Sequence, residues 1–271
     1  MGLRINQNIA AQNSYRNLSV TDGQMSKSLE KLSSGFRINR AADDAAGLSI
    51  SEGLRAQVGG LKVAVRNAQD GISVAQTAEG ALNEVHSILQ RMRDLSVQAA
   101  NDGASDTKAK EAAQAEFAEL SDALDQIGTD TAFGKTKLLD GSFTAKDFQV
   151  GANTGEKVTV TIDEVSATQL GIDTLDLTTG AAAAIDTIDA AIESVSEQRS
   201  TLGASQNWFE HTINNLNVAV ENLSASESRI RDTDMAQEMV SFTRSQILTQ
   251  AGTSMLGQAN QASQNVLSLL R

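Results

Sequence analysis

The sequence predicts a mainly α protein, in which long antiparallel coiled-coil helices form a rod with a small β-hairpin region and the two terminal segments fold back together. Three observations support this fold class. The 271 residues include no proline, a residue that breaks helix interiors. Aromatic residues make up only 3% of the chain, so packing has to rely on aliphatic side chains along thin seams between helices. Long stretches also carry apolar residues at alternating steps of three and four, the spacing of a coiled-coil seam.

The first segment, residues 3–33, is predicted to be a helix with a broken apolar stripe. Asn and Gln side chains dilute this stripe near its start. Such dilution predicts a weakly stable segment that is disordered in a lone monomer. An irregular spacer, residues 33–44, follows and ends in Asp43 and Asp44. We interpret these two carboxylates as a charge pair at a helix N-terminus and not as a catalytic dyad.

The longest predicted helix covers residues 47–100. Its apolar seam consists of Leu54, Val58, Leu61, Val65, Ala68, Ile72, Ala75, Ala78, Leu82, Val85, Leu89 and Met92. Glycines within this helix each cost about 1 kcal/mol relative to alanine. These are Gly53, Gly59, Gly60, Gly71 and Gly80. Either a long helix tolerates them, or they allow a neighbouring chain segment to approach closely.

Beyond a turn at residues 101–107, a shorter helix is predicted for residues 108–128. Residues 157–162 alternate in polarity as a strand does, which predicts one or two β-hairpins between 130 and 177. The helical period returns at Ala181 and continues to Ile230. This second long helix can pair antiparallel with the first and with the short helix, which would leave the hairpins at the far tip. The last segment, after residue 232, is rich in Gln, Ser and Thr, like the first.

Composition excludes several classes of function. The net charge of −12 makes nucleic acid an unlikely partner. The absence of cysteine excludes disulfides and thiolate metal sites. The two histidines, His86 and His211, belong to no HExxH or paired-His pattern, and we interpret them as helix-surface residues. We therefore expect no catalytic residue, cofactor or metal, and no enzyme. No stretch approaches the ~20 apolar residues of a membrane span, and residues 1–20 lack the apolar core of a secretory signal.

Several long motifs near both ends resemble those of bacterial flagellins. They are Leu-Ser-Ser-Gly-Phe-Arg-Ile-Asn at 32–39, Asp-Asp-Ala-Ala-Gly-Leu at 43–48, residues 90–99, residues 228–236, and Gln-Asn-Val-Leu-Ser-Leu-Leu-Arg at 264–271. The resemblance covers both ends and most of the middle. It implies a short flagellin without the variable outer domains, whose subunits polymerise into the flagellar filament for motility.

The resemblance also implies a division of the chain into filament layers. Residues 1–44 and 232–271 would form the inner tube layer, residues 45–129 and 181–231 the outer tube layer, and residues 130–180 a hairpin region. The expected polymerisation residues are apolar positions of the terminal segments. They are Ile5, Ile9, Leu29, Leu32, Leu248, Met255, Val266, Leu267, Leu269 and Leu270.

Partners follow from the same resemblance. Besides itself, the chain would bind an export chaperone through its C-terminal segment, and it would meet the flagellar cap and hook-junction proteins. Export through the flagellar secretion channel would place it in the extracellular flagellum without a cleavable signal. Flagellins detected by Toll-like receptor 5 share a surface matched here by Gln90, Arg91, Arg93, Leu95 and Glu116. The leucine-rich end resembles what intracellular NAIP-type receptors detect.

The chain departs from the family pattern in two places. Trp208 stands where the family commonly has arginine, and Phe133-Gly134-Lys135 replaces a Phe-Asn-Gly turn. Two further interpretations remain open at this point. A hook–filament junction protein shares part of the terminal pattern, and the alternative from a different class is a protein that acts chiefly as a receptor ligand or adhesin.

Overall fold

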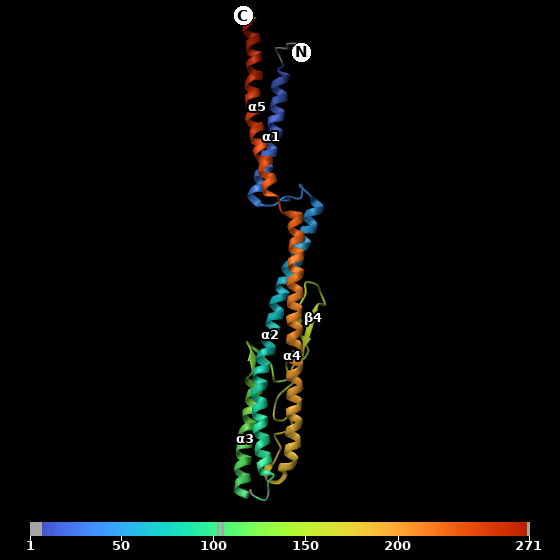
Figure 1. Cartoon of the computed structure of the whole chain (residues 1–271), viewed down its shortest axis with the longest axis vertical. Coiled ribbons are helices and arrows are strands. Elements are labelled where there is room, and N and C mark those ends of the chain that lie inside the picture. Colours follow the sequence, from blue (N-terminus) through green and yellow to red (C-terminus); the bar gives the residue numbers. More distant parts are fainter. Residues whose placement is uncertain (1–6, 102, 104–105, 270–271) are drawn as a thin grey trace. The chain divides into compact units, whose positions relative to one another are not determined.

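The computed structural model describes the backbone of residues 7–101, 103 and 106–269, with side chains up to residue 261. Its elements, in chain order, are α1 (Ile9–Ser34), α2 (Ala45–Ala99), α3 (Thr107–Asp130), β1 (Ala132–Phe133), β2 (Thr136–Lys137), β3 (Lys146–Gln149), β4 (Lys157–Val160), α4 (Leu177–Arg231) and α5 (Met235–Leu269) (Figure 1). The prediction of a mainly helical protein with small β-hairpins is confirmed.

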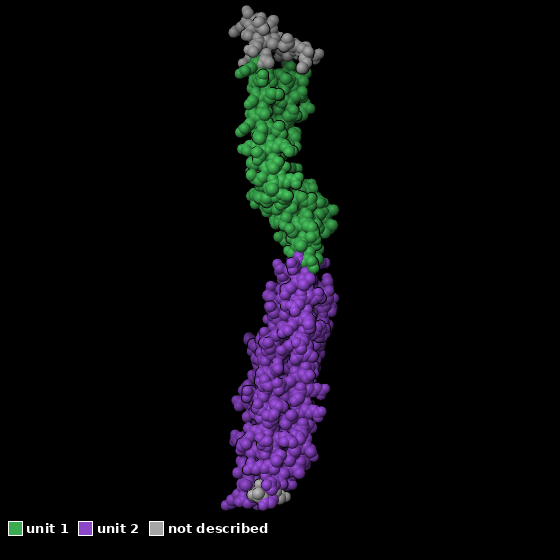
Figure 2. Space-filling model, in the orientation of Figure 1, with its two compact units in different colours: residues 1–56, 222–271 green, residues 57–221 purple. Residues whose placement is uncertain are grey.

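Two compact units make up the chain (Figure 2). One comprises Gln57–Glu221, and the other comprises the residues before and after that range. The boundaries fall inside α2 and α4, whereas the expected filament layers change at 44/45 and 231/232. The division into inner and outer tube layers therefore stays a prediction.

Asparagine or aspartate side chains cap the helix N-termini, where the first backbone N–H groups have no partner within the helix. Asn8 accepts from Ala11 N at 3.0 Å, and Asp106 from Ala109 N at 2.7 Å. Asp44 accepts from Gly47 N at 2.9 Å at the start of α2. Asp43 accepts from the backbone of the preceding turn instead. Both carboxylates thus serve the backbone at the entry to α2, as the sequence predicts.

In the unit Gln57–Glu221, helix α2 packs against α3 on one side and α4 on the other. Contacts between α2 and α4 pair Arg93 with Asp189 and Glu79 with Gln206, so the two helices are antiparallel. The buried core runs from Ala68 to Phe209. Along α2, every member of the predicted seam from Ala75 to Met92 is fully buried, because both α3 and α4 cover this half of the helix. The heptad prediction for this part of α2 is confirmed.

The two hairpins are antiparallel and short. Phe133 pairs with Thr136 across the two-residue turn of β1 and β2, in which Gly134 adopts a φ of 64° that glycine accepts without strain. In β4, Val158 and Val160 are buried in the core, while Lys157 and Thr159 are exposed. The predicted strand at 157–162 is thus confirmed in type but ends two residues earlier.

The prediction that the hairpins lie at the far tip of the helices is wrong. Asn67 of α2 donates from Nδ2 to the Gln149 carbonyl at 2.9 Å, and Phe148 packs edge-on against Phe209 of α4. The hairpin β3–β4 therefore lies along the middle of the long helices (Figure 1). The reason is the path of α3, whose 24 residues run back along α2 for about 36 Å before the first strand begins.

Close approach explains only some of the helix glycines. A Cβ on Gly71 would lie 2.7 Å from the Phe209 ring, and one on Gly60 would lie 3.0 Å from Ala152 Cβ. Gly53, Gly59 and Gly80 have no neighbouring atom within 4 Å of such a Cβ. The sequence could not separate these two groups because a neighbour that is distant in sequence leaves no trace in the local pattern.

These two groups predict opposite effects of the same substitution. Gly71→Ala should lower the free energy of unfolding by about 1–3 kcal/mol, because the fully buried Phe209 ring cannot move aside freely. Gly80→Ala should raise it by up to about 1 kcal/mol through better helix propensity. Urea unfolding of both variants measures the difference. Equal effects at the two positions would contradict the close contact.

Candidate functional site

The terminal helices α1 and α5 lie side by side and antiparallel, joined along a seam of mostly small or polar residues (Figure 1). Asn8 donates from Nδ2 to the Ala259 carbonyl at 3.0 Å, and a Cβ on Gly252 would lie 3.2 Å from Leu18. The buried and half-buried positions repeat at alternating steps of three and four on both helices. They are Ala11, Ser14, Leu18, Thr21, Met25, Ser28 and Leu32 on α1, and Phe242, Ser245, Thr249, Gly252, Leu256 and Ala259 on α5.

Ten larger apolar side chains of the same two helices lie outside this seam and are about half exposed or more. On α1 they are 55% to 67% exposed and comprise Ile9, Tyr15, Val20 and Leu29. On α5 they are 47% to 61% exposed and comprise Met235, Met239, Val240, Ile247, Leu248 and Met255. We call these ten residues the outer apolar face. A lone amphipathic pair normally buries its largest apolar side chains between the helices, so this arrangement leaves apolar area for a partner.

Part of the outer apolar face is hollowed. An open hollow of about 460 Å³ runs along α5 and is lined by Met239, Val240, Thr243, Arg244, Ile247 and Leu248. Apart from Thr243 and Arg244, all of its lining is apolar. The hollow can take apolar side chains from another surface, and Arg244 at its edge can meet a polar or acidic group there.

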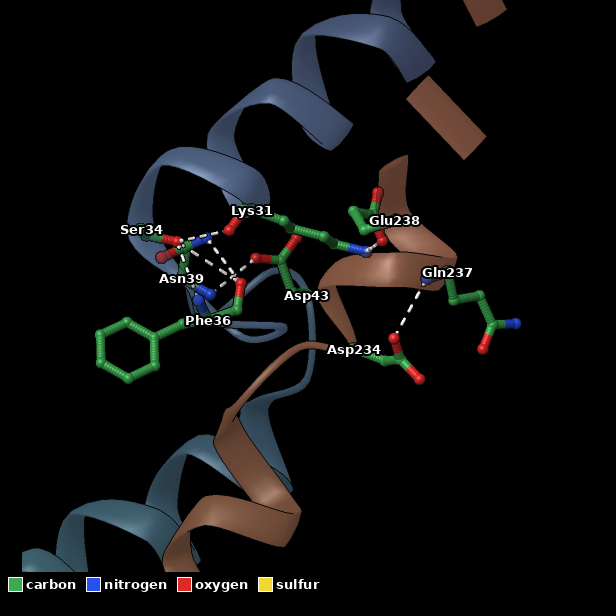
Figure 3. A network of polar contacts seen from close by, with 8 residues as sticks. All are labelled: Lys31, Ser34, Phe36, Asn39, Asp43, Asp234, Gln237 and Glu238. Carbon is green, nitrogen blue, oxygen red and sulfur yellow. Dashed lines mark hydrogen bonds and ion pairs between the residues drawn. The ribbon is translucent and has the colours of Figure 1, made fainter. Parts of the chain in front are cut away.

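A polar network holds the ends of α1 and α5 in place (Figure 3). Lys31 near the end of α1 forms an ion pair with Glu238 in the first turn of α5, at 3.9 Å. Asp234 caps α5 by accepting from Ala236 N and Gln237 N. Hydrogen bonds from the backbone N–H groups of Arg40 and Asn39 hold the pKa of Asp43 below its usual value. These contacts set the register in which the two helices pair.

The chain segments between the long helices are also joined to each other. Arg37 N donates to the Arg231 carbonyl at 2.6 Å, and Thr233 N donates to the Gly35 carbonyl at 3.0 Å. The Arg231 guanidinium lies 4.7 Å from the centre of the Phe36 ring and pairs with Glu52 at 2.7 Å. The segment after α1 and the segment before α5 are therefore bonded to each other. This bonding fixes the pair of helices that carries the outer apolar face.

A second candidate surface lies near the end of α2. Arg91 pairs with Glu116 of α3 at 2.6 Å, and Arg93 pairs with Asp189 of α4 at 2.5 Å. The hydrogen bond from Arg93 lowers the pKa of Asp189, and the same contact raises the pKa of Arg93. Both pairs are about half exposed and link α2 to its two neighbours. The side-chain amide nitrogen of Gln90, which is exposed, lies 2.9 Å from His86 Nε2.

The structure corrects the place of Leu95 within this surface. Gln90, Arg91, Arg93 and Glu116 reach solvent, but Leu95 is only 2% exposed and belongs to the core. Leu95 lies on the seam side of α2, four residues after Arg91, where α3 and α4 cover it. It can support the surface from beneath, and its side chain is not available to a partner.

The predicted polymerisation residues divide into three groups. Ile9, Leu29, Leu248 and Met255 are exposed on the outer apolar face, whereas Leu32 is half-buried in the α1–α5 seam. Ile5 and Leu270 lie outside the described residues. The described side chains also do not include those of Val266, Leu267 and Leu269.

The sequence reasoning missed six members of the outer apolar face. These are Tyr15, Val20, Met235, Met239, Val240 and Ile247. They lie off the single apolar stripe assigned to each terminal segment. A signal was present: Ser, Thr, Ala and Gly recur at heptad spacing on both segments, which is typical of a close helix–helix seam.

Other kinds of site find little support. Across residues 7–101, 103 and 106–269, no three His, Cys, Asp or Glu side chains are grouped so that they could hold a metal ion. Within the same described range, no helix has the length and apolar character needed to cross a bilayer.

Comparison with known proteins identifies the family. A model of the bacterial flagellin N-terminal helical region matches residues 5–144, and one of the bacterial flagellin C-terminal helical region matches residues 185–270. A flagellin of Halalkalibacterium halodurans is 53% identical over 272 residues, covering 98% of this chain and 99% of its own. A flagellin of Bacillus subtilis is 48% identical over 304 residues, covering 99% and 100%.

Solved structures give a related match. The crystal structure of Bacillus cereus flagellin is 30% identical, with a TM-score of 0.49, over 56% of this chain and 88% of its own. The two family models and the near full-length relatives favour a filament subunit over the hook–filament junction protein. The chain belongs to the bacterial flagellin family and is a structural subunit of the flagellar filament.

Proposed function

We propose that the outer apolar face of α1 and α5 is the surface through which this subunit polymerises. The observation that carries the proposal is the packing of the two helices, with mostly small or polar residues in the seam and ten large apolar residues left exposed outside it. At about 25 cal/mol per Å², covering these side chains with neighbouring subunits is the strongest driving force the terminal helices offer. Small and polar side chains outnumber large ones in the α1–α5 seam, so the pair of helices gains stability when neighbouring subunits cover the outer apolar face.

Several partners are part of the same proposal. Export through the flagellar secretion channel precedes assembly, and a chaperone that holds the C-terminal segment keeps its apolar residues covered until then. The cap and hook-junction proteins meet the subunit at the ends of the filament. The family resemblance and the exposed apolar residues of α5 support these roles.

A charge placed in the hollow tests the polymerisation surface. Leu248→Asp should abolish filament formation while leaving the fold of the unit Gln57–Glu221 unchanged, because a buried unpaired carboxylate costs several kcal/mol at an interface. Negative-stain electron microscopy and sedimentation measure polymer, and circular dichroism measures the fold. Glu221→Asp, an exposed change in the other unit, serves as the control. Filaments of normal length from Leu248→Asp would contradict the proposal.

We also propose that the surface of Gln90, Arg91, Arg93 and Glu116 binds the host receptor Toll-like receptor 5. The support is the motif match together with the geometry of the two exposed ion pairs, which hold the guanidinium groups of Arg91 and Arg93 in fixed positions across three helices. Leu95 acts here only as packing beneath the surface. Recognition of the leucine-rich end by NAIP-type receptors remains a prediction from the resemblance.

Binding of the receptor ectodomain can be measured separately from assembly by using non-polymerising chains. Arg91→Ala should weaken binding at least about tenfold, the loss expected for a central interface arginine. Stability should change by no more than about 1 kcal/mol, since exposed ion pairs contribute little. Arg66→Ala is the matched control, because Arg66 is an exposed arginine on the same helix outside the motif. Equal affinities for the two variants would contradict the receptor proposal.

A further inference from the structure

We propose that Met235, Met239 and Met255 of α5 form an oxidation site, at which a peroxide converts the thioethers to sulfoxides and blocks addition of the subunit to a filament. The inference rests on the proposed polymerisation surface. It adds a chemical modification that acts on that surface. It also assigns the site to the subunit that has not yet been assembled.

Exposure separates these methionines from the other two that the structure describes, Met25 and Met92. Met235, Met239 and Met255 are 47%, 50% and 61% exposed, whereas Met92 is fully buried in the α2 seam. Met25 is half-buried between α1 and α5. The chain has no cysteine, so thioether sulfur is the softest nucleophile it offers to a peroxide. Oxidation should therefore concentrate on α5.

The chemistry needs only the peroxide. The sulfur lone pair attacks one peroxide oxygen, an S–O bond forms, and the O–O bond breaks. The sulfur is oxidised by two electrons, and hydrogen peroxide leaves as one molecule of water. The sulfoxide is reversible, because the two classes of methionine sulfoxide reductase each reduce one epimer with thiol electrons.

The consequence for assembly follows from where the sulfurs lie. Met239 lines the hollow on α5 beside Val240 and Ile247, and Met255 belongs to the same outer apolar face. A sulfoxide places a strong hydrogen-bond acceptor where neighbouring subunits cover the surface, and an acceptor buried without a donor is costly. Once assembled, the same methionines are covered, so the incorporated subunit is protected.

The test treats the folded full-length subunit with dilute hydrogen peroxide and then mixes it with short filament seeds. Peptide mass spectrometry should find the ~16 Da gain at the three α5 methionines at least about tenfold faster than at Met92. The rate of seeded growth should fall in proportion to the fraction of α5 methionines that are oxidised. Treatment with methionine sulfoxide reductases of both classes and dithiothreitol should restore it. The matched variant Met235→Leu/Met239→Leu/Met255→Leu keeps the volume and apolar character of the face. It should polymerise before and after peroxide treatment.

A second measurement needs no variant. In a partly oxidised wild-type sample, sulfoxide at the three positions should be depleted from the sedimented polymer and enriched in the supernatant. Even distribution between the two fractions would overturn the proposal, as would equal loss of growth in wild type and the leucine variant. A result that contradicts the proposed polymerisation surface, and not the oxidation site, is distinct from these. In that case Leu248→Asp forms normal filaments without any peroxide.

Discussion

A chain reduced to residues 45–231 is expected to fold as a monomer and to form no filaments. The main buried cluster, from Ala68 to Phe209, lies inside this range, and so do the hairpins. The deleted segments hold α1 and α5, and with them the entire outer apolar face. Folding and polymerisation therefore depend on different parts of the chain, and truncation should separate them.

Circular dichroism should show a helical chain that unfolds cooperatively, and electron microscopy should show no filaments at concentrations where the full-length chain forms them. Removing about 35 residues from only one end should have the same effect, because α1 and α5 each lack a partner without the other. Filaments from any of these truncated chains would contradict the proposed surface. An unfolded 45–231 chain would instead show that the terminal helices contribute to the core.

The substitution Phe209→Ala is expected to give the largest loss of stability from a single side chain. Phe209 is fully buried, packs edge-on against Phe148 at 5.6 Å between ring centres, and fills the space left by Gly71. It therefore joins α4 to both α2 and the β3–β4 hairpin. Truncating a buried aromatic of this kind costs about 3–5 kcal/mol, because the cavity cannot collapse fully.

The neighbouring residue supplies the control. Trp208 is 55% exposed, so Trp208→Ala should change the free energy of unfolding by only about 0.5 kcal/mol. Urea unfolding of the 45–231 chain measures both variants without interference from polymerisation. If Phe209→Ala and Trp208→Ala lower the free energy of unfolding by the same amount, the assignment of Phe209 as the side chain that joins three elements is wrong. The departure at Trp208 from the family arginine thus concerns the surface and not the core.

The packing of α1 and α5 connects stability with assembly. A seam in which small and polar side chains outnumber large apolar ones buries less apolar area than an aliphatic seam, so the isolated pair has a smaller driving force for folding. Neighbouring subunits that cover the outer apolar face add the missing area and stabilise the helices by binding only their folded form. The prediction that the terminal segments are disordered in a lone monomer agrees with this reasoning and stays a prediction.

The sequence by itself determined most of the secondary structure. Apolar periodicity placed α2, α3 and α4 to within a few residues, because a seam repeats locally wherever it packs, whereas α1 begins at Ile9 and not at residue 3 as predicted. The entry to α2 was recognisable from Asp44, whose cap is a contact between near neighbours in the chain. Regular helix in α4 starts at Ala181 as predicted, since Gly180 has non-helical backbone angles.

The tertiary structure alone decided which faces meet. It buried Leu95, left Gly80 open while placing Phe209 against Gly71, and set the hairpins beside the middle of α2. It also left ten large apolar residues of α1 and α5 exposed. The physical reason is common to all four cases. Periodicity states that a helix has a face to bury, but the partner of that face depends on segments that are distant in sequence and on their paths through space.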